Sequence, residues 1–416
     1  MKTKINAFLR TYLAALCLAG LQAAAQSQPT WQTVTIPGLA TGSQLGSVWA
    51  RTRTEAYVWA IQNLGGTNNA QLYRWDGAQW YKVLDAPSHG GDYSVHGVGS
   101  AEVFASAATD IWRSTNSGQT WALQSLPPVN GYLRKLSGTA NNIHVNTQGG
   151  QIIRFDGTAW SISFSDAVDY PYTLDVSAAT EGYYVTCWGW GRWNGSQWSF
   201  TGRQFDFCDV YDTWWMRDGA GNLHWYAVGN NNFSNGIRIW RFDTNTMSFV
   251  CKVCYVFSDG SAQNTGSAVA VWGSAPDDVY LGGGLATSSG GHRTGRLYHY
   301  DGANWSQVTA IGAVAEVAPY GIAGSARDDV WVSLSTDGRL LHYAPPPPSV
   351  AIQMYAGLTI SGQIGATYQI QYSPKLNSPT NWATLTNLTL PSSPYLFFDA
   401  ASASRPVSFY RAVLAP

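Results

Sequence analysis

Charged residues are scarce in this chain, and their scarcity excludes several classes of function. Asp, Glu, Lys and Arg together make up 12% of the 416 residues, and the formal net charge is −1. The sequence contains no run of Lys or Arg. Proteins that bind nucleic acid or an anionic membrane surface need clustered cations. We therefore expect no nucleic-acid partner.

Long apolar runs are also lacking, except near the N-terminus. Residues 12–21 form a short apolar stretch that follows Lys2, Lys4 and Arg10 and precedes three alanines at positions 23–25. This pattern is typical of a cleaved signal peptide, which we place at residues 1–25. No other segment has about 18 continuous apolar residues, so no membrane span is predicted. The mature protein is expected to be secreted or held at the cell surface.

Cysteine is rare as well, with five in the chain. Cys17 lies in the predicted signal peptide, and export favours disulfide bonds among the other four, Cys187, Cys208, Cys251 and Cys254. Of the three pairings that four cysteines allow, we favour Cys187 with Cys208 and Cys251 with Cys254. The alternative is a redox or zinc site at the C-x-x-C motif of residues 251–254. No second ligand pair accompanies this motif, so neither a metal nor a cofactor is predicted.

Glycine and aromatic residues are abundant, with 43 Gly, 20 Trp and 23 Tyr. They recur in a fixed phrase: an aromatic residue, Asp or Asn, Gly, two variable residues and Trp. The four clear copies are WDGAQW (75–80), FDGTAW (155–160), WNGSQW (193–198) and YDGANW (300–305). Asp-Gly or Asn-Gly between apolar runs predicts a β-hairpin, with both residues at positive φ in a type I′ turn.

A second phrase, a small polar turn leading into a β-branched or aromatic strand, lies upstream of each hairpin. Its clearest copies are GSAPDDVYL (273–281), GSARDDVWV (324–332), GSAEVFA (99–105) and GTANNIHV (138–145), and weaker copies bring the total to seven. The copies recur at roughly 40 to 50 residues, which predicts an all-β fold, a seven-bladed β-propeller with four short strands in each blade. The Asp pairs at 277–278 and 328–329 recur with the phrase, so we predict that they are turn residues rather than calcium ligands.

The two ends of the repeat array complement each other. Each complete repeat finishes with a strand that an aromatic residue opens, but the last repeat lacks this strand after LLHY (340–343). A matching segment, WQTVTIP, occurs near the N-terminus at residues 31–37. We predict that this N-terminal strand completes the last blade and closes the ring, which removes an open sheet edge.

A short motif in the second repeat carries a family resemblance. STNSGQTW (114–121) resembles the Asp-box of sialidase-type propellers, with Asn116 in the Asp position. The resemblance implies a structural hairpin on the face away from an active site. The chain departs from sialidases because it has no Arg-Ile-Pro-type motif near its N-terminus. As a whole, the repeats resemble those of exported bacterial propellers.

The repeats predict a propeller domain at residues 26–344, followed by a linker of four prolines at 345–348. Residues 349–416 contain alternating segments typical of β-strands, at 366–373, 381–388, 394–399 and 408–415. These segments resemble a small C-terminal module of secreted proteins from environmental bacteria, roughly a fibronectin-like β-sandwich. The resemblance implies a role in attachment or adhesion. We expect the whole chain to be monomeric.

Departures from the repeat predict where a ligand binds, because insertions in repeat proteins collect in loops on one face. The longest insertions lie at residues 62–70, 229–236 and 284–295. The same face is expected to carry residues 165–170, 187–191 and 205–215, where aromatic rings accompany carboxylates as in a sugar site. The candidate ligand-binding residues are Trp188, Trp190, Tyr170, Asp169, Asp206, Asp209 and Tyr211. The alternative for these aromatic side chains is packing between blades.

Three functions fit this organisation. The first is non-catalytic binding of a glycan or a cell-surface protein through the loop face. The second is a carbohydrate-active enzyme, a glycoside hydrolase or lyase, because hydrolysis needs two carboxylates about 5 to 9.5 Å apart. The loops supply five candidates, Asp166, Asp169, Asp206, Asp209 and Asp212. The third is a surface scaffold or adhesion protein. We favour the first.

Overall fold

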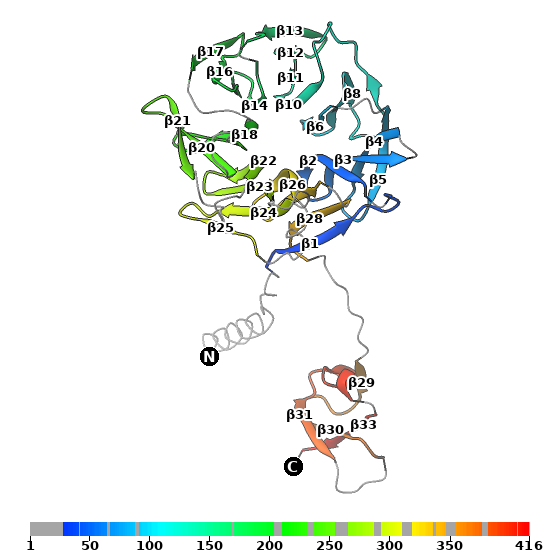
Figure 1. Cartoon of the computed structure of the whole chain (residues 1–416). Helices are drawn as coiled ribbons and strands as arrows, with labels where there is room; N and C mark the ends of the chain where they lie inside the picture. The colour runs from blue at the N-terminus through cyan, green and yellow to red at the C-terminus, as the bar shows by residue number, and fades with distance from the viewer. Residues whose placement is uncertain are drawn as a thin grey trace, which may run out of the picture. The chain divides into compact units, whose positions relative to one another are not determined.

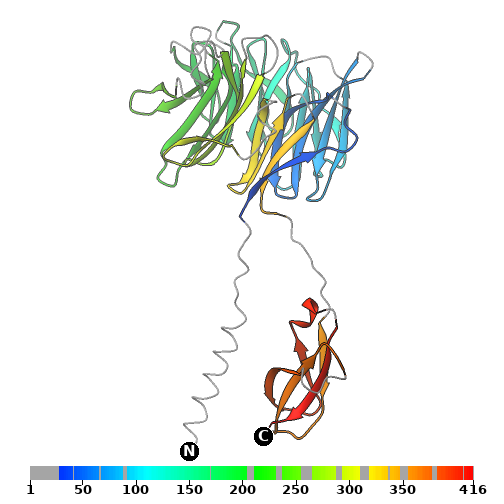
Figure 2. The same ribbon diagram turned by 60° about the horizontal axis from the view of Figure 1, so that its bottom comes forward.

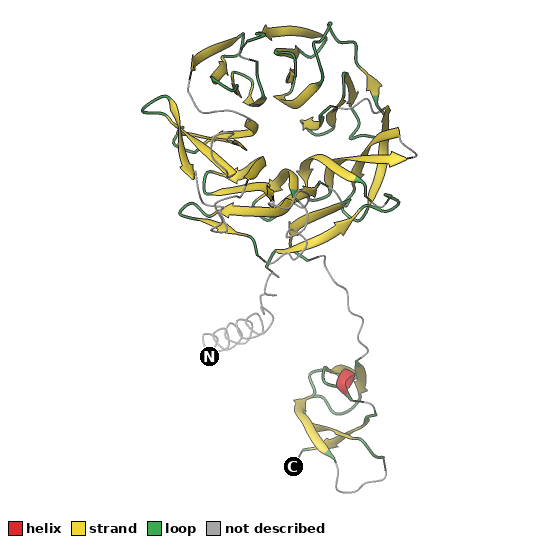
Figure 3. Cartoon of the chain, viewed as in Figure 1, coloured by secondary structure: helices red, strands yellow, loops and turns green. Residues whose placement is uncertain are grey.

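The structure is a computed structural model of the full chain, and it describes residues 28–40, 42–64, 67–87, 91–168, 170–203, 210–230, 237–253, 265–286, 293–309, 318–335, 338–346, 355–376, 382–405 and 407–415. The chain divides into two compact units, Met1–Pro346 and Pro347–Pro416. Strands make up both units, and the described residues contain one short 3₁₀ helix, Ser402–Ser404, in the second (Figure 3). The signal peptide predicted at residues 1–25 lies outside the described residues.

The first unit consists of antiparallel four-stranded sheets, six of which use consecutive strands. The first three contain β2 (Gln44–Thr52), β3 (Glu55–Leu64), β4 (Thr67–Trp75) and β5 (Trp80–Pro87); β6 (Tyr93–Val98), β7 (Glu102–Ala107), β8 (Asp110–Ser114) and β9 (Ala122–Leu123); and β10 (Leu133–Thr139), β11 (Asn142–Thr147), β12 (Gln151–Phe155) and β13 (Trp160–Ser165). The next three contain β14 (Thr173–Ala178), β15 (Glu181–Val185), β16 (Gly189–Trp193) and β17 (Trp198–Arg203); β18 (Val210–Arg217), β19 (Leu223–Asn230), β20 (Ile237–Asp243) and β21 (Ser248–Val253); and β22 (Thr265–Ala275), β23 (Asp278–Ala286), β24 (Arg293–Tyr300) and β25 (Trp305–Gln307). Figure 1 shows these sheets arranged around a common axis.

One further four-stranded sheet joins the two ends of the first unit, which brings the number of such sheets among the described residues to seven. Its strands, in spatial order, are β1 (Thr30–Thr35), β28 (Arg339–Ala344), β27 (Asp329–Leu334) and β26 (Pro319–Ala326). β1 pairs antiparallel with β28, and Trp31 lies opposite Tyr343 with their rings 5.2 Å apart. The predicted pairing of the N-terminal strand with the last strand is therefore confirmed.

Apolar side chains fill the spaces between neighbouring sheets, which Figure 2 shows standing face to face. Each of the seven buried clusters in the described part of the first unit combines residues of two sheets. One of them joins Val58 of β3 to Trp331 of β27, so packing as well as strand pairing links the two ends of the array. Because each sheet is covered on both faces, middle strands such as β27 are buried along their whole length.

The Asp-Gly and Asn-Gly phrases form hairpins between the third and fourth strands of their sheets. The two aromatic residues that flank each turn are paired in all four copies. The predicted turn type is wrong, however, because Gly77 has a φ of 98° whereas Asp76 does not have a positive φ. Instead, Asp76 Oδ1 accepts hydrogen bonds from the backbone N–H groups of Ala78 and Gln79, each at 2.9 Å. The acidic or amide residue is thus a hydrogen-bond acceptor for the turn, and only the glycine needs the left-handed conformation.

The Asp-box-like motif forms the hairpin between β8 and β9. Ser114 Oγ accepts a hydrogen bond from the Gly118 N–H at 2.9 Å, and Asn116 Oδ1 accepts one from the Thr120 N–H at 2.9 Å. Asn116 therefore replaces the aspartate of the motif as a hydrogen-bond acceptor, through its side-chain carbonyl oxygen. This turn connects a third strand to a fourth strand, so it lies at the same end of its sheet as the Asp-Gly turns do in theirs. The predicted structural hairpin is confirmed.

The two Asp pairs lie in turns between first and second strands, as predicted. The second member of each pair is buried and hydrogen-bonded to a histidine of the third strand, Asp278 to His299 at 2.6 Å and Asp329 to His342 at 2.7 Å. The first members form ion pairs with the next sheet, Asp277 with Arg327 at 2.6 Å and Asp328 with Arg53. Each pair therefore fixes its own turn and contributes a link between sheets.

The second unit contains two small sheets. β29 (Ala356–Ile360) pairs with β32 (Tyr395–Asp399), and β30 (Thr367–Ser373) lies between β31 (Ala383–Thr389) and β33 (Phe409–Leu414). Ile360, Ile370 and Leu390 form its small buried core. Asp399 is buried beside them and accepts hydrogen bonds from Arg405 at 2.6 Å and Tyr410 at 2.9 Å. The resemblance of this unit to a fibronectin-like module stays a prediction.

The predicted disulfide bonds fall mostly on residues that the structure does not describe. Cys208 and Cys254 lie outside the described residues, as does the side chain of Cys251 in β21. Cys187 is half-buried in the turn between β15 and β16. Both favoured pairings stay predictions.

Candidate functional site

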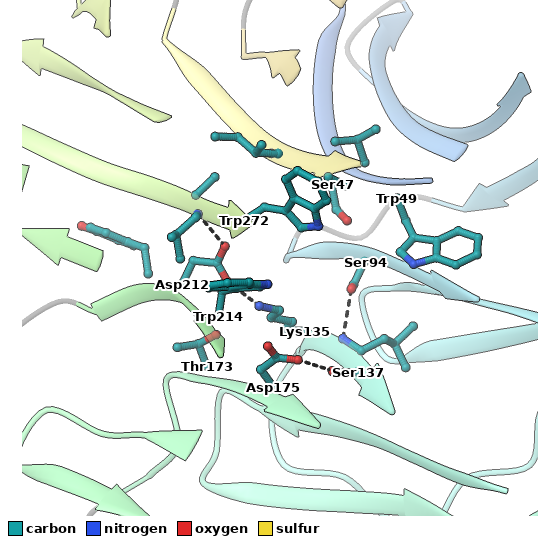
Figure 4. Close-up of a pocket in the computed structure, with 18 of the residues that line it drawn as sticks. Ser47, Trp49, Ser94, Lys135, Ser137, Thr173, Asp175, Asp212, Trp214 and Trp272 are labelled. Atoms are coloured by element: carbon teal, nitrogen blue, oxygen red, sulfur yellow. Dashed lines mark hydrogen bonds and ion pairs between the residues drawn. The ribbon is translucent and has the colours of Figure 1, made fainter. Parts of the chain in front are cut away.

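A cavity of about 670 Å³ lies at the centre of the first unit (Figure 4). Each of the seven four-stranded sheets contributes one edge strand to the wall of this cavity. We call these strands the inner strands; they are β2, β6, β10, β14, β18, β22 and β26. The volume falls within the range of about 300 to 1,000 Å³ that is typical of sites for small molecules. The cavity is therefore the leading candidate for a functional site.

A lysine crosses this cavity. Lys135 of β10 donates hydrogen bonds from Nζ to Asp212 Oδ1 at 2.6 Å and to the Thr213 carbonyl at 2.7 Å, both in β18. Burial by itself would lower the pKa of Lys135, but the carboxylates of Asp212 and Asp175 outweigh it and raise the pKa. The ammonium group is therefore charged, and two of its three N–H groups are used in these bonds.

Asp212 is held by main-chain groups on both of its oxygens. Oδ1 accepts the Thr213 N–H at 2.8 Å in addition to the lysine, and Oδ2 accepts the Val271 N–H of β22 at 3.0 Å. The donors to this carboxylate come from β10, β18 and β22, so Asp212 joins these three inner strands around the cavity.

Asp175 of β14 forms a second buried group on the same side of the cavity, as Figure 4 shows. Its Oδ1 accepts a hydrogen bond from Ser137 Oγ at 2.8 Å, and its Oδ2 accepts one from the Trp215 N–H at 3.3 Å. Burial raises the pKa of Asp175, and the nearby Lys135 offsets this only in part. The carboxyl group is thus less completely neutralised than that of Asp212.

Thr173 lies two residues before Asp175 on β14. It contributes to the cavity wall a hydroxyl group that has no hydrogen-bond partner in the described part of the chain. The residue is 1% exposed, and its Oγ1 has no hydrogen-bond partner among the described residues. An unsatisfied buried hydroxyl costs about 1 to 3 kcal/mol. A ligand with a hydrogen-bonding group would remove this cost.

Tryptophans line the cavity on other sides. Trp49 of β2 and Trp272 of β22 are half-buried, and Trp214 of β18 is 9% exposed. Each indole packs on a glycine of the next inner strand: a Cβ at Gly273 would lie 2.8 Å from Trp214, and one at Gly324 would lie 2.6 Å from Trp272. The glycine that opens the second repeat phrase therefore makes room for the neighbouring ring.

One end of the cavity has a rim of aromatic and charged residues, which we define as Asp92, Arg134, Tyr172, Tyr211 and Tyr320. They lie at the beginnings of inner strands. The Arg134 guanidinium stacks 5.2 Å above the Tyr172 ring, donates to the Tyr172 carbonyl at 3.2 Å and lies 3.8 Å from the Asp92 carboxylate. The rim thus combines a locally balanced ion pair with ring faces.

Two of the rim tyrosines offer the most open surface. Tyr211 is 47% exposed and Tyr320 is 43% exposed. Partial burial, with Asp92 nearby, raises the pKa of Tyr320 to about 12. Its phenol is therefore protonated at neutral pH and keeps a hydrogen to donate.

Three of the residues predicted from the sequence lie at the rim end of their sheets. Tyr211 is a rim residue, and the Tyr170 ring lies 5.1 Å from that of Tyr172. The Tyr172 N–H donates to the Val185 carbonyl at 2.8 Å, so the beginning of β14 adjoins the turn that follows β15. That turn carries Trp188, which is 46% exposed.

The other predicted residues are not at this surface or are not described. Trp190 is 3% exposed and packs 5.0 Å from Phe242 and 5.5 Å from Trp225, between neighbouring sheets. It has no free ring face for a ligand, so packing, the alternative considered from the sequence, is its observed role. Asp169, Asp206 and Asp209 lie outside the described residues, as do residues 65–66, 231–236 and 287–292 of the three long insertions.

Sequence reasoning missed the cavity cluster of Lys135, Thr173 and Asp175. In three repeats the residue before the glycine that opens the second phrase lines the cavity, namely Ser137 before Gly138, Trp272 before Gly273 and Ala323 before Gly324. Lys135, Thr173 and Asp175 do not stand in that position, so the repeat phrases carry no signal for the cluster itself.

No group of His, Cys, Asp or Glu that could hold a metal occurs among the described residues. Within the same residues, no helix has the length and apolarity to span a bilayer.

No family model matches this chain, and no curated protein matches it. Several solved structures are similar in fold. YCF48 bound to a D1 peptide has a TM-score of 0.53 and 19% identity, over 76% of this chain and 96% of that one. A GH74 xyloglucanase from Xanthomonas campestris has a TM-score of 0.51 and 15% identity, over 81% of this chain and 59% of that one. The extracellular domain of a putative one-component system from B. thetaiotaomicron has a TM-score of 0.51 and 12% identity, over 88% of this chain and 47% of that one.

These similarities concern the fold alone. The chain spans less than two thirds of the xyloglucanase and of the B. thetaiotaomicron domain. All three structures are β-propellers, and the described sheets of the first unit surround an axis in the same manner. The first unit of this chain is a β-propeller.

Proposed function

We propose that the chain is an exported seven-bladed propeller that binds a glycan, without catalysis, at the rim and in the central cavity. The observation that carries the proposal is the cavity itself, which has about 670 Å³, wall residues from all seven inner strands and rings beside polar groups. Sugars need this combination, since ring faces stack on their apolar faces and polar groups satisfy their hydroxyls.

The size and the charges of the cavity support a glycan over a protein surface. A concave site of this volume holds a few sugar rings, whereas a protein partner buries roughly 800 Å² on each side of a flat interface. The charged groups are interleaved with hydroxyl groups of Ser47, Ser94 and Thr173. Among structures of similar fold, one is a xyloglucanase and one is bound to a peptide. A chain that binds only peptides would give no signal on the glycan array described below.

Binding is favoured over hydrolysis because Asp212 accepts three hydrogen bonds from Lys135 and the backbone. Most of the acceptor positions of this carboxylate are thus in use, which leaves little capacity to bond a reacting group. The carboxylates predicted for catalysis at positions 169, 206 and 209 lie outside the described residues, and the enzyme alternative stays a prediction.

A glycan array with the full chain tests the proposal, using Tyr211→Ala and Tyr320→Ala as site variants. Tyr81, exposed on the outer strand β5, supplies a matched control as Tyr81→Ala. We expect the native chain and the control to bind the same glycans, and each rim variant to lose at least about tenfold in affinity, as for loss of one stacking contact. Absence of glycan binding, or binding that both rim substitutions leave unchanged, would overturn the proposal.

A further inference from the structure

The ionisable side chains that line the central cavity do not balance in charge. Within the described residues, three are carboxylates, Asp92, Asp175 and Asp212, and two are cations, Arg134 and Lys135. His96 also lines the cavity, but burial lowers its pKa to about 4, so it is neutral at pH 7. With all three carboxylates ionised, the two cations leave one formal negative charge in surplus.

The surplus belongs to Asp175. Asp92 lies 3.8 Å from Arg134 at the rim, and Asp212 lies 2.6 Å from Lys135 at the centre. Asp175 has hydrogen bonds from Ser137, Trp215 and, at 3.3 Å, Ser177, but no ion pair in the described part of the chain. Burial also raises the pKa of Asp175, so without a cation beside it this carboxyl takes up a proton more readily than an exposed one. A cationic ligand would favour its ionised form.

A second, independent feature lies beside Asp175. The Thr173 hydroxyl is buried and has no partner, and the ammonium of Lys135 has one N–H beyond the two that its bonds use. Figure 4 shows Thr173, Asp175, Asp212 and Lys135 together on one side of the cavity, with Trp272 and Trp49 among the other lining residues. The wall therefore offers a negative charge and a free hydroxyl group to one occupant, and indole rings to its remaining surface.

We propose, on the basis of the glycan-binding function above, that the sugar which enters the cavity is an amino sugar with a free ammonium group. Asp175 is its counter-ion, Thr173 bonds one of its hydroxyl groups, and the indoles of Trp49 and Trp272 face its ring. A cation near indole faces gains a further attraction from the ring quadrupole.

Other sugar classes satisfy the cavity less well. A neutral sugar brings no cation to Asp175, and an acidic sugar places a like charge beside it. A simple alkyl amine would neutralise Asp175 but would leave the Thr173 hydroxyl without a partner.

The test is isothermal titration calorimetry of the full chain with a glucosamine trisaccharide and with its fully N-acetylated counterpart. The two probes differ in charge, since N-acetylation removes the amine, and a pH of about 6 keeps the free amine protonated. We expect the glucosamine form to bind at least about tenfold more tightly, which corresponds to one compensated charge. Asp175→Asn should abolish this preference, while Asp85→Asn, at an exposed carboxylate in β5, should keep it.

Equal affinity for the two probes, or a preference that survives Asp175→Asn in a folded variant, would overturn the amino-sugar inference while glycan binding itself stands. Failure of the chain to bind either probe or any glycan on the array would instead overturn the proposed function. The thermal melting temperature of each variant reports whether it is folded.

Thr173→Val gives a second test that does not depend on the folding of Asp175→Asn. Because the hydroxyl forms no bond, its replacement by a methyl group should leave the melting temperature unchanged or raise it. The affinity for the glucosamine trisaccharide should nevertheless fall by about tenfold. A lower melting temperature with unchanged affinity would show that Thr173 is structural and would overturn its assigned contact.

Discussion

Lys135 and Asp212 are bonded at 2.6 Å although they belong to sheets that the β14–β17 sheet separates. The bond therefore joins two inner strands that are not neighbours, β10 and β18, within the cavity. Four neighbouring sheets meet at this contact. Asp212 of β18 also accepts the Val271 N–H of β22, and Lys135 of β10 lies near Asp175 of β14. The same contact divides the cavity wall into a neutralised part at Asp212 and an incompletely neutralised part at Asp175.

Loss of this lysine should destabilise the propeller. Lys135→Met leaves Asp212 and Asp175 without their shared cation in a largely buried site, and we expect a loss of about 2 kcal/mol or more in the free energy of unfolding. Urea denaturation followed by tryptophan fluorescence measures it. Lys82→Met is the matched control, because Lys82 pairs with Asp85 on the exposed surface at 2.8 Å and should cost no more than about 0.5 kcal/mol. Equal losses in the two variants would refute a central role for Lys135.

Removal of the N-terminal strand should open the ring. Deletion of residues 26–38 takes away β1 and exposes the edge of β28, together with the surface that Trp31 covers on Tyr343. Several kcal/mol of packing and strand pairing are lost, so we expect the melting temperature to fall by more than about 10 °C. Differential scanning calorimetry is the measurement. An unchanged melting temperature would contradict closure through β1.

The hairpin glycines should differ in their tolerance of alanine. Gly77 and Gly99 both have positive φ, but a Cβ at Gly77 would lie 2.8 Å from Thr54 Cγ2, whereas nothing lies within 4 Å of one at Gly99. We expect Gly99→Ala to cost about 1 kcal/mol for the backbone conformation alone, and Gly77→Ala to cost about 1 to 2 kcal/mol more. Chemical denaturation of both variants tests this, and similar costs would show that the turn shifts to make room.

The stability of the propeller should fall in acid through Glu181. Its side chain in β15 accepts hydrogen bonds from Arg217 of the next sheet at 2.5 and 2.7 Å and from Tyr183 at 2.6 Å. The bond with Arg217 is the main reason why the pKa of Glu181 is lowered in the folded protein, against the opposing effect of burial. A group whose folded pKa is depressed stabilises the fold above its unfolded pKa, near 4.5, and loses that contribution as the pH falls through the folded pKa.

Melting temperatures of the native chain and of Glu181→Gln, measured from pH 7 down to about pH 3, test this linkage. The native chain should be the more stable at pH 7, and the difference should shrink below about pH 4.5 as the carboxylate takes up its proton. A difference that stays constant over the whole range would contradict the assigned effect of Arg217.

Much of the fold was predictable because interactions between residues close in the sequence specify the repeat. The Asp-Gly hairpins need only four residues to specify them, and the strand at residues 31–37 was recognisable because it matched the piece missing after residue 343. The turn type was wrong at Asp76 because the same residue can adopt a positive φ or accept two backbone hydrogen bonds, and the sequence does not choose between them.

The candidate site was harder to predict because its residues come from different repeats. Lys135 and Asp212 are separated by 77 positions and meet only because the ring places β10 and β18 around one cavity. Trp190 follows Trp188 by two residues, yet one is buried and the other exposed, since β16 begins between them. Composition and motif spacing carry no information on such pairings. In three repeats the residue before the phrase glycine lines the cavity, but Lys135, Thr173 and Asp175 do not occupy that position.

Titration of the full chain with the glycan that gives the strongest array signal tests the central claim, binding at the rim and cavity, most directly. The account predicts one ligand per chain by calorimetry, the same affinity in Tyr81→Ala, and at least about a tenfold loss in Tyr320→Ala. Several ligands per chain, or an affinity that Tyr320→Ala leaves unchanged, would place the ligand elsewhere and contradict the account.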